Sequence, residues 1–222
     1  MARPRSSRSA LLVAAERIFA ERGLAGARTE EIASAAHINK AMLHYYFETK
    51  EKLYQAVLEN LFQQLHLSLR DPLSRTPAPR AALLGFVDHY INFLQQHPNY
   101  PRLLQREIME RGPYLRVVVE RYLGPIFSSL ARILRAGIRR GEFRSVDVNQ
   151  TVVSLIAITV FYFAATPVMS LVLGGNAYDA RRVAARKRAV VDFVRHGLLR
   201  SPHQKPSAAT NRKRAKKKGK RR

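Results

Sequence analysis

The 222-residue sequence contains no cysteine. A disulfide framework, a thiolate nucleophile and a cysteine-based zinc site are therefore excluded, and a reducing compartment is compatible with the chain. Catalytic signatures are missing as well, because there is no phosphate-cradling glycine loop, G-x-S-x-G elbow, H-E-x-x-H pair or EF-hand loop. The seven histidines are scattered without metal-ligand spacing. We therefore expect no enzyme activity, no metal and no cofactor.

Acidic residues are scarce, with 16 Asp and Glu against 39 Lys and Arg, which gives a formal net charge of +23. Ten of the cations lie in residues 203–222, where there is no acid, so the rest of the chain still carries +13 (23 minus 10). A body this basic indicates a polyanionic partner, either nucleic acid or an acidic membrane surface. With 46% hydrophobic residues, the chain is long enough to bury a core in one or two domains.

The first residues, MARPRSSRSALLVAAERIF, have a basic start followed by a short apolar run. Glu16, Arg17, Glu21 and Arg22 interrupt that run before a signal-peptide core is complete. We therefore expect these residues to begin the mature fold. There is no internal repeat.

Helical periodicity dominates the first quarter of the chain. Gly23 follows a cationic last turn and is predicted to end the first helix, while Thr29, Asn39 and Thr49 are predicted N-caps of the next three. The four helices are expected over residues 7–22, 29–36 and 40–46, and from residue 50 onward. Two short helices joined by a tight turn make a helix-turn-helix.

The second helix of this motif has two chemically different faces. The apolar residues expected to face inward against the first helix are Ile32, Ile38, Leu43 and Phe47. The residues left outside are Lys40, Ala41, Met42, His44 and Tyr45. These outward side chains suit a DNA major groove, where Lys reaches guanine acceptors, Ala and Met touch a thymine methyl, and Tyr and His bond phosphates.

The stretch RSALLVAAERIFAERGLAGARTEEIASAAHINKAMLHYYFETKEKLYQAVLEN resembles the DNA-binding domain of the TetR family of bacterial transcriptional regulators. The resemblance is carried by the A-A-x-x-x-F pattern of the first helix and by these further residues: Gly23, Thr29, Ile32, Ala33, the run 43–47 and Lys50. The family usually has Gly at the turn, where this chain has His37, and His tolerates positive φ at some cost.

The resemblance implies a DNA-binding set, which comprises Thr29, Asn39, Lys40, Ala41, Met42, His44, Tyr45, Tyr46 and Lys50. In that set Thr29 contacts phosphate and the two tyrosines contact the DNA backbone, while Lys50 lies at the groove edge. The residues implied to face bases are Lys40, Ala41, Met42 and His44. Structural interpretations stay open at this stage for three members: Tyr46 as core, Met42 as a helix filler and His44 as a solvated surface residue.

The rest of the chain is also predicted to be helical, so the fold class is all-α, with an N-terminal three-helix helix-turn-helix domain and a larger helical regulatory and dimerisation domain. Residues 70–80, rich in proline and turn formers, are predicted to be a loop. Further helices are expected at 80–96, 101–111, 114–140 with a kink near Gly124-Pro125, 146–173 and 179–200. The expected division is 1–52, 53–201 and a disordered basic tail at 202–222.

Residues 152–175 carry no charge over 24 positions, which is enough to span a bilayer. One interpretation is therefore a membrane-associated interaction protein that uses this helix and the basic tail. The favoured interpretation is a subunit interface. It follows from the resemblance, because in the TetR family the last two long helices pack with those of a second subunit. A helix buried from both sides is expected to be apolar all round. The tail either adds nonspecific DNA affinity or only solubilises the chain.

The resemblance implies a cytoplasmic, ligand-responsive regulator, most simply a repressor, that binds a near-palindromic operator as a homodimer. Its small-molecule effector is unknown. The candidates to line an effector pocket are Phe86, Tyr90, Phe93, Glu107, Ile108, Tyr122, Phe127 and Phe161. Glu107 is the expected orienting acid, and core packing remains the alternative role for the apolar members.

Overall fold

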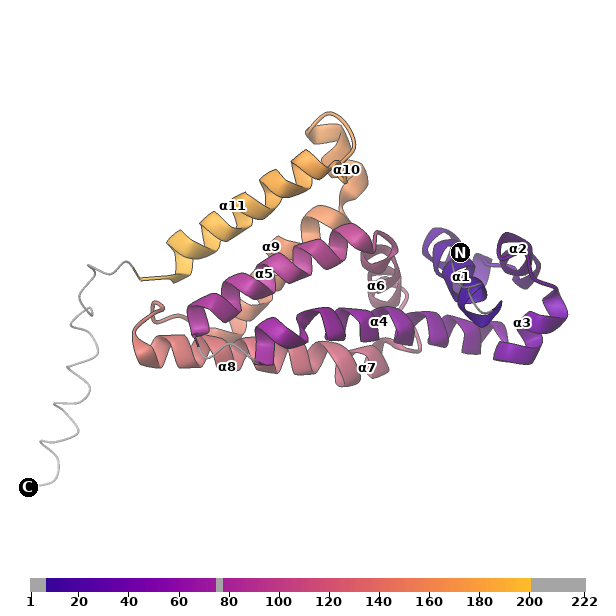
Figure 1. Cartoon of the computed structure of the whole chain (residues 1–222), viewed down its shortest axis with the longest axis horizontal. Helices are drawn as coiled ribbons and strands as arrows, with labels where there is room; N and C mark the ends of the chain where they lie inside the picture. Colours follow the sequence, from indigo (N-terminus) through magenta and orange to yellow (C-terminus); the bar gives the residue numbers. More distant parts are fainter. Residues whose placement is uncertain (1–6, 75–77, 201–222) are drawn as a thin grey trace, which may run out of the picture.

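A computed structural model describes residues 7–74 and 78–200, and every regular element within those ranges is a helix. One short helix cluster, α1 to α3, lies at one end of the molecule, and the long helix α4 connects it to a larger bundle (Figure 1). The all-α prediction is thus confirmed. The predicted tail, 202–222, lies outside the described residues.

The first cluster consists of α1 (Ser7–Gly26), α2 (Thr29–Ala35) and α3 (Lys40–Phe47). α1 runs past its predicted end, with a kink at Gly23, where φ is 71°. The predicted N-cap role of Thr29 was wrong, because Arg28 occupies the N-cap position and Thr29 is already the first helical residue. The turn before α3 has His37 at φ 56°, as expected from its place in the motif, and Asn39 caps α3.

The connecting helix α4 (Lys50–Ser74) begins after Thr49, whose hydroxyl accepts a hydrogen bond from the Lys52 amide at 3.1 Å. It continues through Pro72, so the loop predicted at residues 70–80 is shorter than expected. The bundle continues with α5 (Pro79–Gln96) and α6 (Asn99–Met109). Pro79 stands in the first turn of α5, where a missing N–H costs nothing.

The helix predicted at 114–140 runs without a gap, but its hydrogen-bond pattern changes along its length. α7 (Leu115–Val118) leads into a π-helical segment, η1 (Val119–Leu123), and then α8 (Gly124–Arg140). The irregularity predicted near Gly124-Pro125 therefore exists, and it takes the form of a widened turn just before Pro125.

The helix predicted at 146–173 was wrong as a single element. It is divided into α9 (Val148–Ala164) and α10 (Thr166–Val172), which are bent by 74°. Pro167 lies in the first turn of α10, where its ring would obstruct a continuous helix. The last helix, α11 (Ala180–Leu198), begins after Asp179, whose carboxylate accepts from the amides of Arg181 and Arg182.

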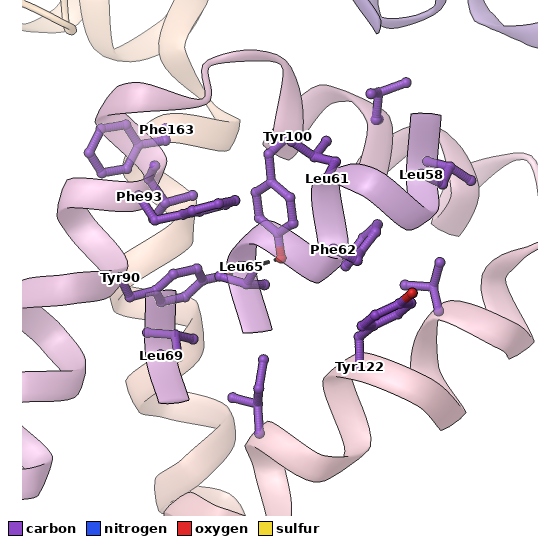
Figure 2. Packing of buried hydrophobic residues seen from close by; sticks show 14 of the residues in the cluster. Leu58, Leu61, Phe62, Leu65, Leu69, Tyr90, Phe93, Tyr100, Tyr122 and Phe163 are labelled. Atoms are coloured by element: carbon purple, nitrogen blue, oxygen red, sulfur yellow. Dashed lines mark hydrogen bonds between the residues drawn. The ribbon is translucent and has the colours of Figure 1, made fainter. Parts of the chain in front are cut away.

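One apolar core runs through both parts of the molecule. In the bundle, α4, α5 and α6 supply a dense group of aromatic and leucine side chains (Figure 2). Tyr100 is fully buried, with its ring 5.3 Å from the rings of both Phe62 and Phe93. Because burying such large rings contributes strongly to stability, this core fixes α6 against α4 and α5.

Candidate nucleic-acid interface and ligand cavity

The helix α3 divides into a buried face and an exposed face, as its sequence predicted. Leu43 and Phe47 are buried. The residues on the other face, which we call the α3 face, are all exposed: Lys40, Ala41, Met42, His44 and Tyr45. Tyr45 is the most open of its large side chains, with 77% of its surface exposed. The α3 face is therefore available to a partner.

Lys40 is held by an ion pair across the motif. Its ammonium group donates to the Glu30 carboxylate at the start of α2. This contact lowers the pKa of Glu30 to about 2, chiefly through the hydrogen bond from Lys40. Both side chains are largely exposed, so the pair is weak and another anion can replace the carboxylate.

Three other members of the predicted DNA-binding set make contacts within the protein. The Asn39 side-chain oxygen accepts from the Ala41 amide at 2.9 Å. The half-buried Lys50 ammonium donates to the carbonyls of Ala25 at 3.4 Å and Ala27 at 3.2 Å. Lys50 thus ties the start of α4 to the end of α1. Tyr46 is half-buried against the core.

Two exposed residues at the ends of α2 were not part of the predicted DNA-binding set. Arg28 is exposed at the N-cap position of α2, one residue before the half-buried Thr29. His37 is exposed in the turn. The only sequence signal for Arg28 was its charge next to a predicted helix start, and for His37 it was the departure from glycine. Both add positive or protonatable groups beside α2 and α3.

The junction between the helix cluster and the bundle centres on Glu107 of α6, which is only 2% exposed. Its carboxylate accepts from the Tyr54 hydroxyl at 2.7 Å and from the Tyr114 amide at 3.2 Å. Burial and the neighbouring carboxylate together raise the pKa of Tyr54. The ring of Tyr54 also meets Phe19 of α1, with 4.9 Å between centroids.

A neighbouring residue strengthens the same junction. The guanidinium of Arg106 donates to the carbonyls of Ala20 at 3.2 Å and Glu21 at 2.7 Å, both on α1. Glu107 and Arg106 therefore fasten α6 to α4 and α1. The acid that was predicted to orient an effector lies in this junction rather than among the residues that line the cavity described next.

A cavity of about 250 Å³ lies inside the bundle, between α4, α5, α6, η1, α8 and α9. Of the eight predicted pocket residues, the structure places Phe86, Tyr90 and Phe127 in its lining. Further lining residues that the sequence did not single out are Leu65, Leu69, Tyr100, Leu104, Val119 and Leu123.

The remaining apolar members of the predicted pocket lie elsewhere. Phe93 and Tyr122 are buried in the adjoining core, where Phe93 meets Tyr100 and Tyr122 stacks on Phe62. Ile108 and Phe161 are on the surface, with 54% and 61% of their side chains exposed. The aromatic or apolar character of a residue in the sequence therefore did not indicate whether it lines the cavity, packs in the core or lies on the surface.

A second exposed feature is the α9–α11 apolar surface. It consists of Val153, Phe161, Val168, Leu171, Val172, Leu173 and Phe193. Within residues 7–74 and 78–200, no single helix has the length and hydropathy to cross a bilayer. α9 and α10 meet such a test only as a pair, and the 74° bend lies between them. Large apolar side chains exposed together on neighbouring helices often mark an interaction site.

Comparisons with known proteins match both parts of the chain. Residues 11–57 match the family described as "Bacterial regulatory proteins, tetR family", and residues 79–194 match "Tetracyclin repressor-like, C-terminal domain". The chain is 28% identical to the HTH-type transcriptional repressor NicS of Pseudomonas putida, over 87% of this chain and 93% of NicS. It is 26% identical to the HTH-type transcriptional regulator RutR of Escherichia coli, over 86% of this chain and 91% of RutR.

Solved structures agree on the fold. The ketosteroid transcriptional regulator KstR2 of Mycobacterium tuberculosis superimposes with a TM-score of 0.72 at 23% identity, covering 90% of this chain and 98% of that one. The TetR family regulator PfmR from Thermus thermophilus gives a TM-score of 0.72 at 21% identity, covering 89% of this chain and 100% of that one. None of these comparisons supports the membrane alternative.

Proposed function

The chain belongs to the TetR family of bacterial transcriptional regulators, and we propose that it is a ligand-responsive repressor that binds a near-palindromic DNA operator as a homodimer. The observation that carries the proposal is the exposed α3 face, built on a helix whose other side is fixed in the core. NicS is a repressor by name, and this favours the same sign of regulation here.

The chemistry of the α3 face suits reading a major groove. Lys40 can donate to guanine acceptors, and Ala41 and Met42 can contact thymine methyl groups. His44 and Tyr45 can bond phosphates, which would fix the orientation of the helix on the duplex. For Lys40, DNA would replace the Glu30 carboxylate as the counter-ion.

The homodimer is supported by the α9–α11 apolar surface, which leaves large side chains such as Leu171 and Phe193 in water, 84% and 67% exposed. A twofold axis through this surface would cover it with the same surface of a second copy. Two copies of α3 would then be presented to two half-sites of the operator.

We expect Leu171→Glu to weaken this dimer, because it places a carboxylate where an apolar partner surface should be. Leu67→Glu is the matched control, since Leu67 is also exposed, at 55%, but belongs to α4 and not to the α9–α11 apolar surface. Sedimentation velocity should show a dimer for the wild type and the Leu67 variant and a shift toward monomer for the Leu171 variant. A monomeric wild type would contradict the dimer proposal.

A route from ligand to DNA runs through α6. Tyr100 and Leu104 line the cavity, while Arg106 and Glu107 on the same helix hold α1 and α4. A ligand that favours a different position of α6 would change how the two α3 helices are spaced. The effector acts only to the extent that it binds the two dimer shapes with different affinity.

The proposal also sets a division of the chain and a location. We propose that DNA recognition belongs to residues 1–52, that effector binding and dimerisation belong to 53–201, and that 202–222 is a basic extension. α4 runs through the first of these boundaries without a break, so the two parts would move as connected bodies. A chromosomal operator as partner implies that the protein acts in the cytoplasm.

The experiment that tests the proposal is selection of duplexes from a random DNA pool by the full-length chain at about 0.15 M salt, where nonspecific phosphate contacts are weakened. We expect enrichment of a near-palindromic motif with half-sites about one helical turn apart or somewhat more. Retention of DNA without any enriched motif would contradict the proposal and leave only a charge-driven affinity.

A further inference from the structure

The cavity in the bundle is lined almost entirely by hydrocarbon, and none of its lining residues is charged. At about 250 Å³ it is larger than the roughly 150 Å³ apolar cavity that accepts benzene in an engineered protein. A two-ring or medium-chain molecule therefore matches its size. Burying a carboxylate or an ammonium group there would lose its hydration without gaining a counter-ion.

One polar feature lies in this lining, the hydroxyl pair of Tyr90 and Tyr100. The two oxygens are 3.4 Å apart, longer than the usual 2.7–2.8 Å or so between hydroxyls, and Figure 2 shows Tyr100 extending from α6 toward Tyr90. Two hydroxyls carry two protons, and the bond between them uses one. Among the described residues, no acceptor receives the other.

Both hydroxyls remain donors across the physiological pH range. Burial raises the pKa of Tyr90 to about 12 and that of Tyr100 well above its ordinary value. A buried donor without an acceptor is unfavourable, and an incoming oxygen atom would relieve that cost. The pair is thus a preformed donor at the edge of an apolar space.

Another part of the cavity wall, at η1 and the start of α8, has an irregular backbone. The Gly124 amide donates to the Val119 carbonyl, five residues earlier, which makes η1 a π-helix. Because residue 124 is glycine, the wall has no side chain at this point. A β-carbon there would lie only 3.1 Å from the Val119 carbonyl oxygen. Single π-helical turns occur often at functional sites, and this one borders the cavity through Val119, Leu123 and Gly124.

We propose that the cavity takes an uncharged, mainly apolar molecule that carries one hydrogen-bond-accepting oxygen, such as a ketone, and that the Tyr90–Tyr100 pair donates to this oxygen. This inference rests on the proposed function, because it names the class of ligand that the effector site of the proposed regulator would bind. Carboxylate ligands of the same size are excluded by the uncharged lining.

Calorimetric titration of the full-length chain with three probes of similar size tests the ligand class. The probes are 1-tetralone, tetralin and tetralin-1-carboxylate, which are a ketone, a hydrocarbon and an anion. We expect 1-tetralone to bind most tightly, tetralin more weakly, and the carboxylate not at all. A carboxylate that binds as tightly as the ketone, or a ketone that does not bind up to its solubility limit, would overturn the proposal.

Three variants locate the contact. The double change Tyr90→Phe and Tyr100→Phe should weaken 1-tetralone about threefold to tenfold and leave tetralin unchanged, because one neutral hydrogen bond is lost. Tyr162→Phe is the matched control, since its hydroxyl donates to the Ala177 carbonyl at 2.8 Å, away from the cavity. Val160 on α9 also lines the cavity, and Val160→Phe should fill the space and abolish binding of both neutral probes.

Ligand binding by the tyrosine pair and operator binding by the chain are tested separately. If the double variant binds 1-tetralone as tightly as the wild type does, the assignment of the tyrosine pair is overturned, whatever the DNA selection shows. If the DNA selection enriches no motif, the proposed function fails even when 1-tetralone binds in the cavity.

Discussion

The buried hydrogen bond between Tyr54 and Glu107 gives a quantitative prediction. Tyr54→Phe removes a 2.7 Å hydrogen bond to a carboxylate that is 2% exposed, and the amide of Tyr114 is left as the remaining donor to it. Hydrogen bonds to charged groups contribute about 1.5–3 kcal/mol. We expect the variant to lose about 2 kcal/mol of unfolding free energy, and for a chain of this size that lowers Tm by about 4–8 °C.

The assay is urea unfolding at fixed protein concentration, because the proposed dimer would make the apparent stability depend on concentration. Tyr122→Phe is the matched control: its ring is also buried, but its hydroxyl has no hydrogen-bond partner within residues 7–74 and 78–200. The control should change stability by less than about 0.5 kcal/mol. Equal losses in the two variants would refute the reasoning, since loss of a tyrosine hydroxyl would then cost the same with or without the carboxylate contact.

A double-mutant cycle isolates the pair. In a Glu107→Gln background, Tyr54→Phe should cost less than about 1.5 kcal/mol, because the acceptor is then uncharged. The pH dependence has a defined sign as well. The pKa of Tyr54 is raised in the folded state, so its stabilising contribution is complete below about pH 10 and is lost as the pH rises further. The stability difference between wild type and Tyr54→Phe should therefore narrow above about pH 10.

Three further predictions concern charge and packing. Glu30→Gln should tighten binding to any duplex about twofold to tenfold at low salt, because it releases Lys40 and removes a negative charge beside the proposed DNA-binding face. Fluorescence anisotropy measures this affinity. An affinity equal to that of the wild type would contradict the prediction. Gly137→Ala should destabilise the fold by about 1–3 kcal/mol in thermal unfolding, because a β-carbon there meets the ring of Phe143, whereas Gly197→Ala, with open space around it, should be neutral or stabilising. Deleting residues 203–222 should weaken specific and nonspecific duplexes alike and flatten the salt dependence, and an unchanged salt slope would rule out a DNA contact by the tail.

The α3 face was predictable from the sequence because its signals are local. Leu43 and Phe47 repeat at helical spacing, and Asn39 and Thr49 stand where a capping side chain is needed. Those residues fix which side of the helix is buried without reference to distant parts of the chain. The exposure of the face follows directly from that spacing.

The contacts of the junction and the cavity were not predictable, because their partners are far apart in sequence. Glu107 is an acid on a helix of mixed character, and nothing near it indicates that Tyr54, 53 residues earlier, supplies its hydrogen bond. The Tyr90–Tyr100 pair joins two helices across the loop between α5 and α6. Which aromatic residue lines a cavity depends on how helices pack, and periodicity does not contain that information.

The division of the helix predicted at 146–173 shows how a local signal was outweighed. The uninterrupted apolar run favoured one long helix, yet Pro167 cannot be accommodated in the middle of one without breaking a hydrogen bond. The chain instead begins α10 at Thr166, whose hydroxyl donates to the Phe163 carbonyl at 2.5 Å. Proline rather than hydropathy therefore sets the helix boundary at this position.

The central claim is that the α3 face reads DNA sequence, and it is tested most directly by the ratio of affinities for the selected operator and a scrambled duplex of the same length. Lys40→Ala should lower that ratio about tenfold, because a base contact is worth about 1–3 kcal/mol of discrimination. Lys52→Ala, which removes an exposed cation at the start of α4, should weaken both duplexes equally and keep the ratio. A ratio that Lys40→Ala leaves unchanged would contradict the claim.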